Sequence, residues 1–313
     1  MRNFLIIPIL FIFLVSCSNS EDFDIPKISK LEKLEEHSNQ FIKGIYSYDN
    51  GIHVAIGFGI ANSIMVEGEG GNIIIDTTDD VSQAKEVLSE FQKINQNPIK
   101  AIIYTHNHGD HVFGASEFYN AQEEKPLVIA HSTTAEKVEK ILGIINPIIT
   151  LRSGKMFGTN LDDNELINVG LGPDLSAGRS SPGYIAPTLT FEKELKLEIA
   201  GHKVELYHAP GETDDQLFVW FPELSALMPG DNFYTTFPNL YTIRGTSHRD
   251  VIGWVNSIDK MRSLDPQYLF PSHTMPVEGE EISNALIIYR DGMQYVHDQT
   301  VRLMNKGLTP DEI

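Results

Sequence analysis

The feature that most constrains this chain is a run of histidines placed directly after a buried strand. Residues 99–104 read IKAIIY, a short apolar segment typical of a strand inside a sheet, and residues 105–111 follow as THNHGDH. Three imidazoles and one carboxylate thus fall within six positions, where a loop can turn them toward one point. Such a cluster predicts a metal site that is delivered by the end of a buried strand.

The types of ligand narrow the choice of metal. The only cysteine of the sequence is Cys17, so the chain after it offers no thiolate. Imidazole and carboxylate without sulfur suit Zn²⁺, and two groups of ligands this close together suit two ions. We therefore expect two zinc ions. The alternative is a polar loop that is rich in histidine by chance, but the HxHxDH spacing argues against it.

The segments before this loop alternate in hydrophobic period. Residues 51–56, 63–67 and 72–76 are rich in β-branched residues and read as strands, whereas residues 81–95 carry apolar positions at helical spacing. Together with the strand at 99–104, this order of strand, helix and strand predicts a layered α/β domain.

Composition excludes one class of partner. The 43 acidic residues outnumber the 24 lysines and arginines, and the formal net charge is −19. Binding to nucleic acid requires clustered basic side chains that displace counterions, and the sequence contains no basic block. The hydrophobic fraction of 41% is large enough for a substantial core.

The N-terminus predicts export. A short cationic start, residues 1–3, precedes the apolar segment 4–15, which is too short for the ~20 residues of a bilayer-spanning helix and is typical of a signal peptide. Residues 14–17, LVSC, resemble a bacterial lipobox, in which the cysteine is lipidated. We expect an exported lipoprotein, periplasmic or on the cell surface, that is anchored to the membrane through Cys17. An ordinary secretory signal with an incidental cysteine is the alternative.

The THNHGDH motif after a strand resembles the metal-binding motif of the metallo-β-lactamase superfamily. The resemblance implies a four-layer αβ/βα sandwich with the metals at the edges of its two sheets. It also covers Asp76, which falls where the family has an aspartate that is not a ligand itself but orients the metal loop, here residues 105–111.

Three downstream segments resemble the remaining parts of this family's metal centre. Residues 208–216, HAPGETDDQ, resemble its Pro-Gly-His-Thr turn with glutamate at the histidine position. Residues 226–232, ALMPGDN, resemble the strand end that supplies the bridging carboxylate, and residues 270–274, FPSHT, resemble the last strand. The resemblance implies His106, His108 and Glu212 as ligands of the first zinc, Asp110, His111 and His273 as ligands of the second, and Asp231 as the bridge.

The glutamate at position 212 narrows the subfamily. Alkyl sulfatases of the metallo-β-lactamase type are similar in carrying glutamate there, and residues 237–245, FPNLYTIRG, resemble their sulfate-binding segment. The resemblance implies that Asn239 and Arg244 hold the sulfate and, with Asp231 as a possible proton acceptor, form the catalytic set. A guanidinium fork matches a tetrahedral oxyanion better than the point charge of lysine. His248 and Arg249 follow closely enough to reach the same ligand.

The sequence therefore predicts a zinc-dependent alkyl sulfatase that hydrolyses small alkyl sulfate esters to alcohol and inorganic sulfate. Its predicted parts are a signal peptide at 1–17, a polar tether and short helix at 18–40, a catalytic domain at 41–285, and the start of a helical, dimerisation-like region at 286–313. Because that last region resembles a dimerisation region, a homodimer is a further expectation.

Two departures from the family keep alternatives open. The bridging position is usually glutamate in these sulfatases, whereas Asp231 is one methylene shorter. The sulfatases also continue beyond the point where this sequence stops, so a fragment and a shortened protein are both open. One alternative function is a lactonase or β-lactamase-like hydrolase of the same fold, which normally has histidine in place of Glu212. Another is a non-catalytic, metal-stabilised surface lipoprotein.

Overall fold

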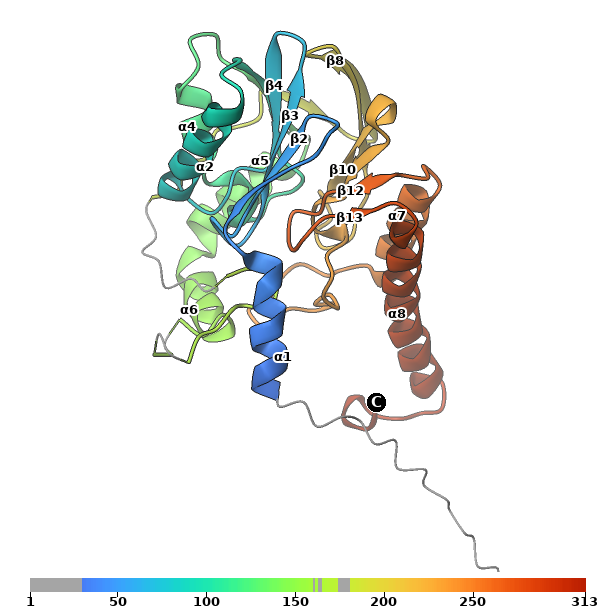
Figure 1. Cartoon of the computed structure of the whole chain (residues 1–313). Helices are drawn as coiled ribbons and strands as arrows, with labels where there is room; N and C mark the ends of the chain where they lie inside the picture. Colours follow the sequence, from blue (N-terminus) through green and yellow to red (C-terminus); the bar gives the residue numbers. More distant parts are fainter. Residues whose placement is uncertain (1–29, 160, 163–164, 174–180) are drawn as a thin grey trace, which may run out of the picture.

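Two β-sheets packed face to face organise the chain, and helices cover the outer face of each sheet (Figure 1). The computed structural model describes residues 30–313 except 160, 163–164 and 174–180. The predicted signal peptide, Cys17 and the tether up to residue 29 lie outside the described residues, as does the middle of the loop between residues 170 and 188.

The first sheet has seven strands, which neighbour one another in chain order. Strands β1 to β4 pair antiparallel, and β4 to β7 pair parallel. The strands are β1 (Gly44–Ser47), β2 (Ile52–Ile56), β3 (Ser63–Gly68), β4 (Gly71–Ile75), β5 (Ile99–Ile103), β6 (Leu127–His131) and β7 (Leu189–Phe191). The strands predicted at 51–56, 63–67, 72–76 and 99–104 are confirmed to within one residue at each end.

The second sheet has six strands in the order β13-β12-β11-β10-β9-β8, and only the β11–β12 pair is parallel. Its strands are β8 (Glu194–Ile199), β9 (His202–His208), β10 (Leu217–Phe221), β11 (Ala226–Met228), β12 (Tyr268–Leu269) and β13 (Val277–Glu278). Because β9, β11 and β12 run in the same direction, their carboxyl ends meet at one edge of this sheet.

Side chains alternate between the two faces of each sheet, so one set fills the core between the sheets and the other packs against the outer layers. In β2, Ile52, Val54 and Ile56 face the second sheet and join a core that includes Val204 and Leu206 of β9. The residues between them point to the opposite face, because successive side chains of a strand alternate. This two-sided burial explains the almost unbroken apolar strands of the first sheet.

Short helices cover the outer face of the first sheet. The longest of them, α2 (Val81–Ile94), begins at Asp80, whose side chain accepts hydrogen bonds from the backbone of Ser82 and Gln83. Its residues Ala84, Val87 and Phe91 recur at helical spacing and are buried against the sheet. The neighbouring helices are α3 (Gly109–Val112), α4 (Ala115–Asn120) and α5 (Thr134–Glu139).

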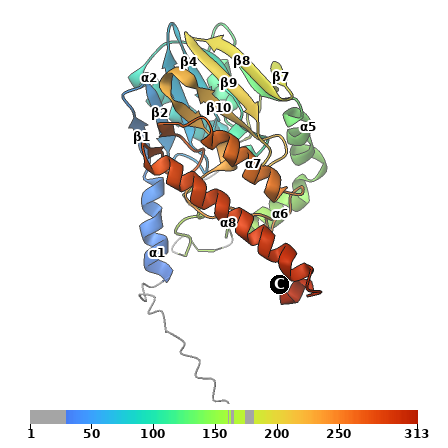
Figure 2. The same ribbon diagram turned by 90° about the vertical axis from the view of Figure 1, so that its right-hand side faces the viewer.

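Two helices cover the second sheet, α7 (Val251–Arg262) and the longer α8 (Glu281–Met304), and Figure 2 shows α8 running across this side and on beyond the sheets. Trp254 of α7 and Leu286 of α8 are buried in the hydrophobic cluster between these helices and the second sheet. The four layers confirm the predicted αβ/βα sandwich with a helical C-terminal region. The predicted boundary between residues 285 and 286 falls inside α8. Among the described helices, none is long and apolar enough to cross a membrane.

The N-terminal helix is part of this body rather than of a tether. Helix α1 (Lys30–His37) continues into the 3-10 turn η1 (Ser38–Phe41). The side-chain amide of Asn168 donates a 2.9 Å hydrogen bond to the carbonyl of Leu34, and the His37 ring lies 2.5 Å from the carbonyl of Gly170. The sequence predicted globular structure only from residue 41, because these partners lie 133 and 134 positions away along the chain.

Candidate metal centre

Five segments that follow strands meet where the two sheets share an edge. Asp76 follows β4, and the 105–111 loop follows β5, its parallel neighbour. From the second sheet, Glu212 follows β9, Asp231 follows β11 within the turn η4 (Gly230–Asn232), and His273 follows β12. Carboxyl ends of parallel strands lie at the same edge, which explains how segments far apart in sequence supply one centre.

Six of the seven predicted metal ligands form two triads. His106, His108 and Asp231 offer ligand atoms that all lie within 4.8 Å of one another, and Asp110, His111 and His273 form a second group on the same criterion. Five of these residues are buried, and Asp110 is partly exposed.

Asp231 lies between the triads. Its Oδ2 is 3.6 Å from Nε2 of His106 and 3.4 Å from Nε2 of His111, and its Oδ1 is 3.1 Å from Nε2 of His273. One carboxylate therefore faces imidazoles of both groups. This is the position that a bridging ligand between two ions requires.

Two buried ring nitrogens bear on whether these residues fit metal ions. Nε2 of His106 and Nε2 of His111 are buried, and neither has a hydrogen-bond partner among the described residues. A buried polar atom without a partner costs free energy, and a bound ion is one reason for which native proteins keep such an atom. The donor set of imidazole and carboxylate suits divalent cations, so these residues fit a pair of metal ions.

Asp76 holds the metal loop from behind. Its carboxylate accepts hydrogen bonds from the backbone and hydroxyl of Thr105, at 2.9 and 2.8 Å, and from the hydroxyl of Ser272 at 2.7 Å. It also lies 2.8 Å from Nδ1 of His111. Occupying Nδ1 directs Nε2 of His111 into the second triad, which is consistent with the orienting role expected from the sequence.

Glu212, the seventh predicted ligand, lies beside the first triad. Its Oε1 is 4.0 Å from Nδ1 of His108 and accepts a 2.7 Å hydrogen bond from the guanidinium of Arg249. Burial raises the pKa of Glu212 to about 7, although the charge of Arg249 acts in the opposite direction. Arg249 is itself only 3% exposed and also donates to the backbone carbonyl of Asn239. The sequence placed Arg249 near the sulfate segment but could not show that its partner is Glu212.

The imidazoles of the two triads differ in charge. Burial, assisted by the neighbouring His111, lowers the pKa of His106 to about 4, and burial lowers the pKa of His108 well below its usual value. Burial also acts to lower the pKa of His273, but the carboxylate of Asp231 outweighs it and raises the value to about 9. At neutral pH the first triad therefore offers neutral imidazoles, whereas a cation entering the second triad must displace a proton.

Arg244 lies at the rim of the centre. Its Nη2 is 3.3 Å from Nε2 of His108, and its side chain is half-buried. Asn239, the other predicted sulfate-binding residue, has an exposed side chain, and its backbone carbonyl anchors Arg249. His248 is exposed.

The segment that carries Arg244 also has exposed apolar side chains. Phe237, Tyr241 and Ile243, from the same segment, are 57%, 70% and 87% exposed. Large apolar side chains grouped on a surface often mark a binding site for an apolar partner or ligand.

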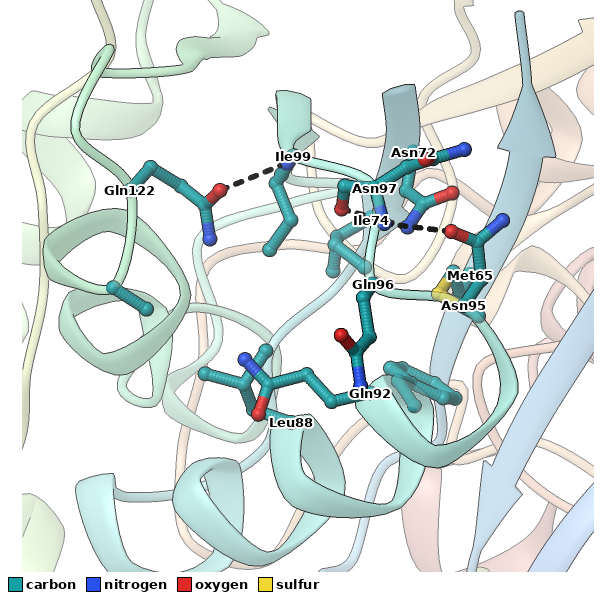
Figure 3. A pocket seen from close by; sticks show the side chains of 12 residues that line it. Met65, Asn72, Ile74, Leu88, Gln92, Asn95, Gln96, Asn97, Ile99 and Gln122 are labelled. Atoms are coloured by element: carbon teal, nitrogen blue, oxygen red, sulfur yellow. Dashed lines mark hydrogen bonds between the residues drawn. The ribbon is translucent and has the colours of Figure 1, made fainter. Parts of the chain in front are cut away.

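A separate cavity of about 390 Å³ lies at the other end of the first sheet (Figure 3). It is lined by Asn72 and Ile99, at the amino ends of β4 and β5, and by carboxamides such as Asn97 and Gln122. Strands of this length span about 16 Å, so the cavity is not continuous with the metal centre. None of its lining residues is a predicted site residue.

With this fold and this centre, the chain belongs to the metallo-beta-lactamase superfamily, which matches residues 56–273. Within that superfamily it is similar to alkylsulfatases. The linear primary-alkylsulfatase of Pseudomonas sp. (strain ATCC 19151) is 42% identical over 256 residues, which cover 80% of this chain and 48% of that protein. The alkyl/aryl-sulfatase BDS1 of Saccharomyces cerevisiae (strain ATCC 204508 / S288c) is 28% identical over 287 residues, covering 87% and 44%.

Solved structures agree with these relatives. The stereoselective inverting sec-alkylsulfatase Pisa1 from Pseudomonas sp. superposes with a TM-score of 0.82 at 25% identity, covering 89% of this chain and 45% of that one. A metallo-beta-lactamase family protein from Thermus thermophilus, 18% identical with a TM-score of 0.57, covers 81% of this chain and 82% of its own and shares the fold. The chain spans about half the length of the curated relatives it matches.

Proposed function

We propose that this chain hydrolyses alkyl sulfate esters to alcohol and inorganic sulfate with the help of two Zn²⁺ ions. The observation that carries the proposal is the position of Arg244, whose guanidinium lies 3.3 Å from His108, a residue of the first triad. An anion-binding fork thus adjoins a centre suited to cations. The similarity to primary, secondary and aryl sulfatases supports the choice of a sulfate ester.

The two ions would be held by the seven predicted ligands: His106, His108 and Glu212, Asp110, His111 and His273, and Asp231 between them. When bound, such ions supply Lewis-acid activation of water at neutral pH and neutralise developing negative charge. The protein's own residues would do the rest. Arg244 binds and orients the sulfate oxygens through two N–H groups, and Asn239 adds a donor from the same segment. Asp231 would accept a proton from the attacking water.

The exposed apolar side chains of the segment that carries Arg244 support an ester with a hydrophobic tail. An alkyl sulfate has an anionic head and an apolar chain, and the segment that carries Arg244 offers both kinds of contact. Burial of each methylene against Phe237, Tyr241 or Ile243 contributes about 0.8 kcal/mol. Affinity should therefore rise with the length of the alkyl chain.

Export and membrane anchorage through Cys17 belong to the same proposal, and their support is the sequence of residues 1–17. Expression of the chain in a bacterium with a labelled fatty acid tests them. We expect label in the wild-type protein and none in Cys17→Ser. Unlabelled wild-type protein would argue for an ordinary signal peptide. The homodimer likewise stays a prediction, for which the mass of the purified protein in solution is the measurement.

Metal analysis paired with a sulfate-release assay tests the central proposal. We expect two zinc ions per purified chain, release of sulfate from dodecyl sulfate, and loss of both metal and activity in Glu212→Ala. Turnover of a lactone or β-lactam without sulfate release would favour another hydrolase of this fold. Two bound ions with no turnover of any of these substrates would favour a non-catalytic, metal-stabilised protein.

A further inference from the structure

Asp215 is a buried carboxylate beside the metal centre that belongs to neither triad. Its side chain is inaccessible to solvent, and its two oxygens accept hydrogen bonds from neutral groups. The side-chain amide of Asn107 donates to Oδ1 at 2.5 Å, and the hydroxyl of Thr134 donates to Oδ2 at 2.8 Å. A carboxylate placed in the interior at this cost calls for an explanation.

The position of Asn107 gives Asp215 access to the metal loop. Asn107 stands between His106 and His108, the two imidazoles of the first triad, so a contact at its side chain acts on the stretch of loop that spaces them. Asp215 belongs to the turn that carries Glu212, and Thr134 is the first residue of α5. The side chain of Asp215 therefore connects three parts of the protein: the metal loop, the turn that carries Glu212, and helix α5 of the outer layer.

A backbone contact fixes the same two segments a second time. The amide of Leu217, at the start of β10, donates a 2.9 Å hydrogen bond to the carbonyl of Thr105. Thr105 precedes His106, whereas Asn107 follows it. The loop is thus attached on both sides of His106 to residues 215–217, at the end of the turn that leads into β10, and the attachment after His106 depends on Asp215.

The two buried aspartates hold different residues of the loop. Asp76 holds the two ends of the loop, through the backbone and hydroxyl of Thr105 and through Nδ1 of His111 in the second triad. Asp215 makes its contact at Asn107, within the first triad's part of the loop. Each triad therefore has a buried carboxylate that holds its part of the loop without being a ligand: Asp215 for the first triad and Asp76 for the second.

We propose that Asp215 is a positioning residue that sets the geometry of the first triad through its hydrogen bond to Asn107. The inference rests on the proposed metal centre. Partners behind the ligands typically affect metal affinity about 10- to 100-fold, because they hold the ligands in the orientation that the ion requires. Breaking the contact should therefore weaken one of the two metal sites and leave the other.

Titration of the metal-free chain with Co²⁺, followed by its visible absorption and by competition with a chelator, tests this role without an activity assay. We expect Asp215→Ala and Asn107→Ala each to weaken one of two binding steps by about 10- to 100-fold and to change its absorption spectrum. The double variant should be no worse than either single variant, because both remove the same contact. If Asp215→Ala does not fold, Asn107→Ala carries the test, since it keeps the bond between Asp215 and Thr134.

Two further variants separate positioning from charge and from general destabilisation. Asp214→Ala is the matched control, because Asp214 is the exposed neighbour and pairs with Lys137 at the surface; it should bind Co²⁺ like the wild type. Asp215→Asn should bind within about threefold of wild type, because its amide can accept from Asn107 and donate to Thr134.

The outcomes that overturn the inference are distinct. Lower melting temperatures with unchanged Co²⁺ affinity and spectra in Asp215→Ala and Asn107→Ala would leave Asp215 a merely structural residue. A wild-type chain that binds no Co²⁺ would overturn the metal centre, and the positioning role with it.

Discussion

The guanidinium of Arg249 donates a 2.7 Å hydrogen bond to the carboxylate of Glu212, and both side chains are buried. The same guanidinium donates to the backbone carbonyl of Asn239, in the segment that carries Arg244. Arg249 therefore connects a predicted metal ligand to the predicted sulfate-binding segment. Such a pair is costly to break, because loss of one partner leaves the other charge buried without compensation.

Substitution of Arg249 by methionine should destabilise the metal-free protein strongly. We expect the free energy of unfolding at pH 8 to fall by about 3 to 5 kcal/mol, because the buried carboxyl of Glu212, whose pKa burial raises to about 7 even beside Arg249, would lose the charge that compensates it. In the presence of Zn²⁺ the loss should be smaller, because a cation in the first triad offsets the carboxylate. Denaturant unfolding with and without Zn²⁺ measures both values.

The control for this experiment is Arg290→Met. Arg290 of α8 pairs with Asp259 of α7 at 3.1 Å, but both side chains are partly exposed. Its loss should cost about 1 kcal/mol or less, with or without metal. Equal losses for Arg249→Met in the two conditions would contradict the placement of Glu212 among the metal ligands.

Arg244→Ala should separate sulfate turnover from metal binding. Removal of one preorganised group that stabilises developing charge lowers kcat/KM by about 10² to 10³-fold, while two ions remain bound. Arg244→Lys should fall between the wild type and alanine, because an ammonium cannot form the two parallel hydrogen bonds of a guanidinium. Sulfate release and metal content are measured on the same samples, with Arg262→Ala as the control on α7. Unimpaired hydrolysis of dodecyl sulfate by Arg244→Ala would refute its assigned role.

The stability of the metal-free protein should fall as the pH rises from 6.5 to 9. The pKa of His273 is raised from 6.5 to about 9, with burial opposing and the carboxylate of Asp231 causing the rise. The folded state thus binds this proton more tightly than the unfolded state does. The resulting stabilisation is complete below pH 6.5 and is lost as the pH rises through 9, about 3 kcal/mol in total.

Unfolding of the metal-free protein by denaturant at pH 6 and at pH 9.5 measures this change. His273→Gln cannot take up the proton, so the difference between the two pH values should shrink in that variant. A variant with the same pH dependence as the wild type would show that another group is responsible.

Gly230→Ala should damage both stability and metal binding. Gly230 has a φ of +59°, and a Cβ there would lie 2.2 Å from Nε2 of Gln216 and 2.8 Å from Cβ of Thr105. Left-handed backbone costs about 1 to 2 kcal/mol for alanine, and the overpacking adds about 1 to 3 kcal/mol. Relief of the clash would displace Asp231, its neighbour, so metal affinity should fall as well.

Gly279→Ala is the matched control for this glycine. Gly279 has a φ of +62°, but no atom lies within 4 Å of its added Cβ. Gly279→Ala should therefore lose only the stability that the left-handed backbone costs an alanine, and it should bind metal like the wild type. Thermal unfolding and chelator competition on both variants measure the difference, and equal effects would mean that the close packing around Gly230 is easily relieved.

The strands and the helix of the first layers were predictable because their signals are local. Apolar runs such as residues 72–76 and 99–104, and the helical spacing of residues 81–95, each depend on a short stretch of chain. The four-layer arrangement followed from the metal-loop motif and its resemblance to a family. The sequence did not predict that the folded body begins with α1. This helix is attached through Asn168, and no sequence pattern identifies Asn168 as its partner.

The candidate site was predictable in part for the same reason. The ligands between His106 and His111 are adjacent in sequence, and Glu212, Asp231 and His273 lie in segments that resemble known turns. No such signal identified Asp215, whose partner Asn107 is 108 positions away, or the pairing of Arg249 with Glu212 across 37 positions. Pairings of this kind depend on how the sheets stack, which no short window of sequence contains.

The amino-acid sequence by itself determined the chemistry available to this protein: imidazole and carboxylate without thiolate, acidic charge overall, and an arginine in a segment rich in apolar residues. The tertiary structure decided which atoms face one another. It placed Asp231 between two triads and buried carboxylates behind each of them, because the carboxyl ends of five strands in two sheets converge at one shared edge. Burial at that edge then set the charges of the individual imidazoles, which depend on distance in space and not on position along the chain.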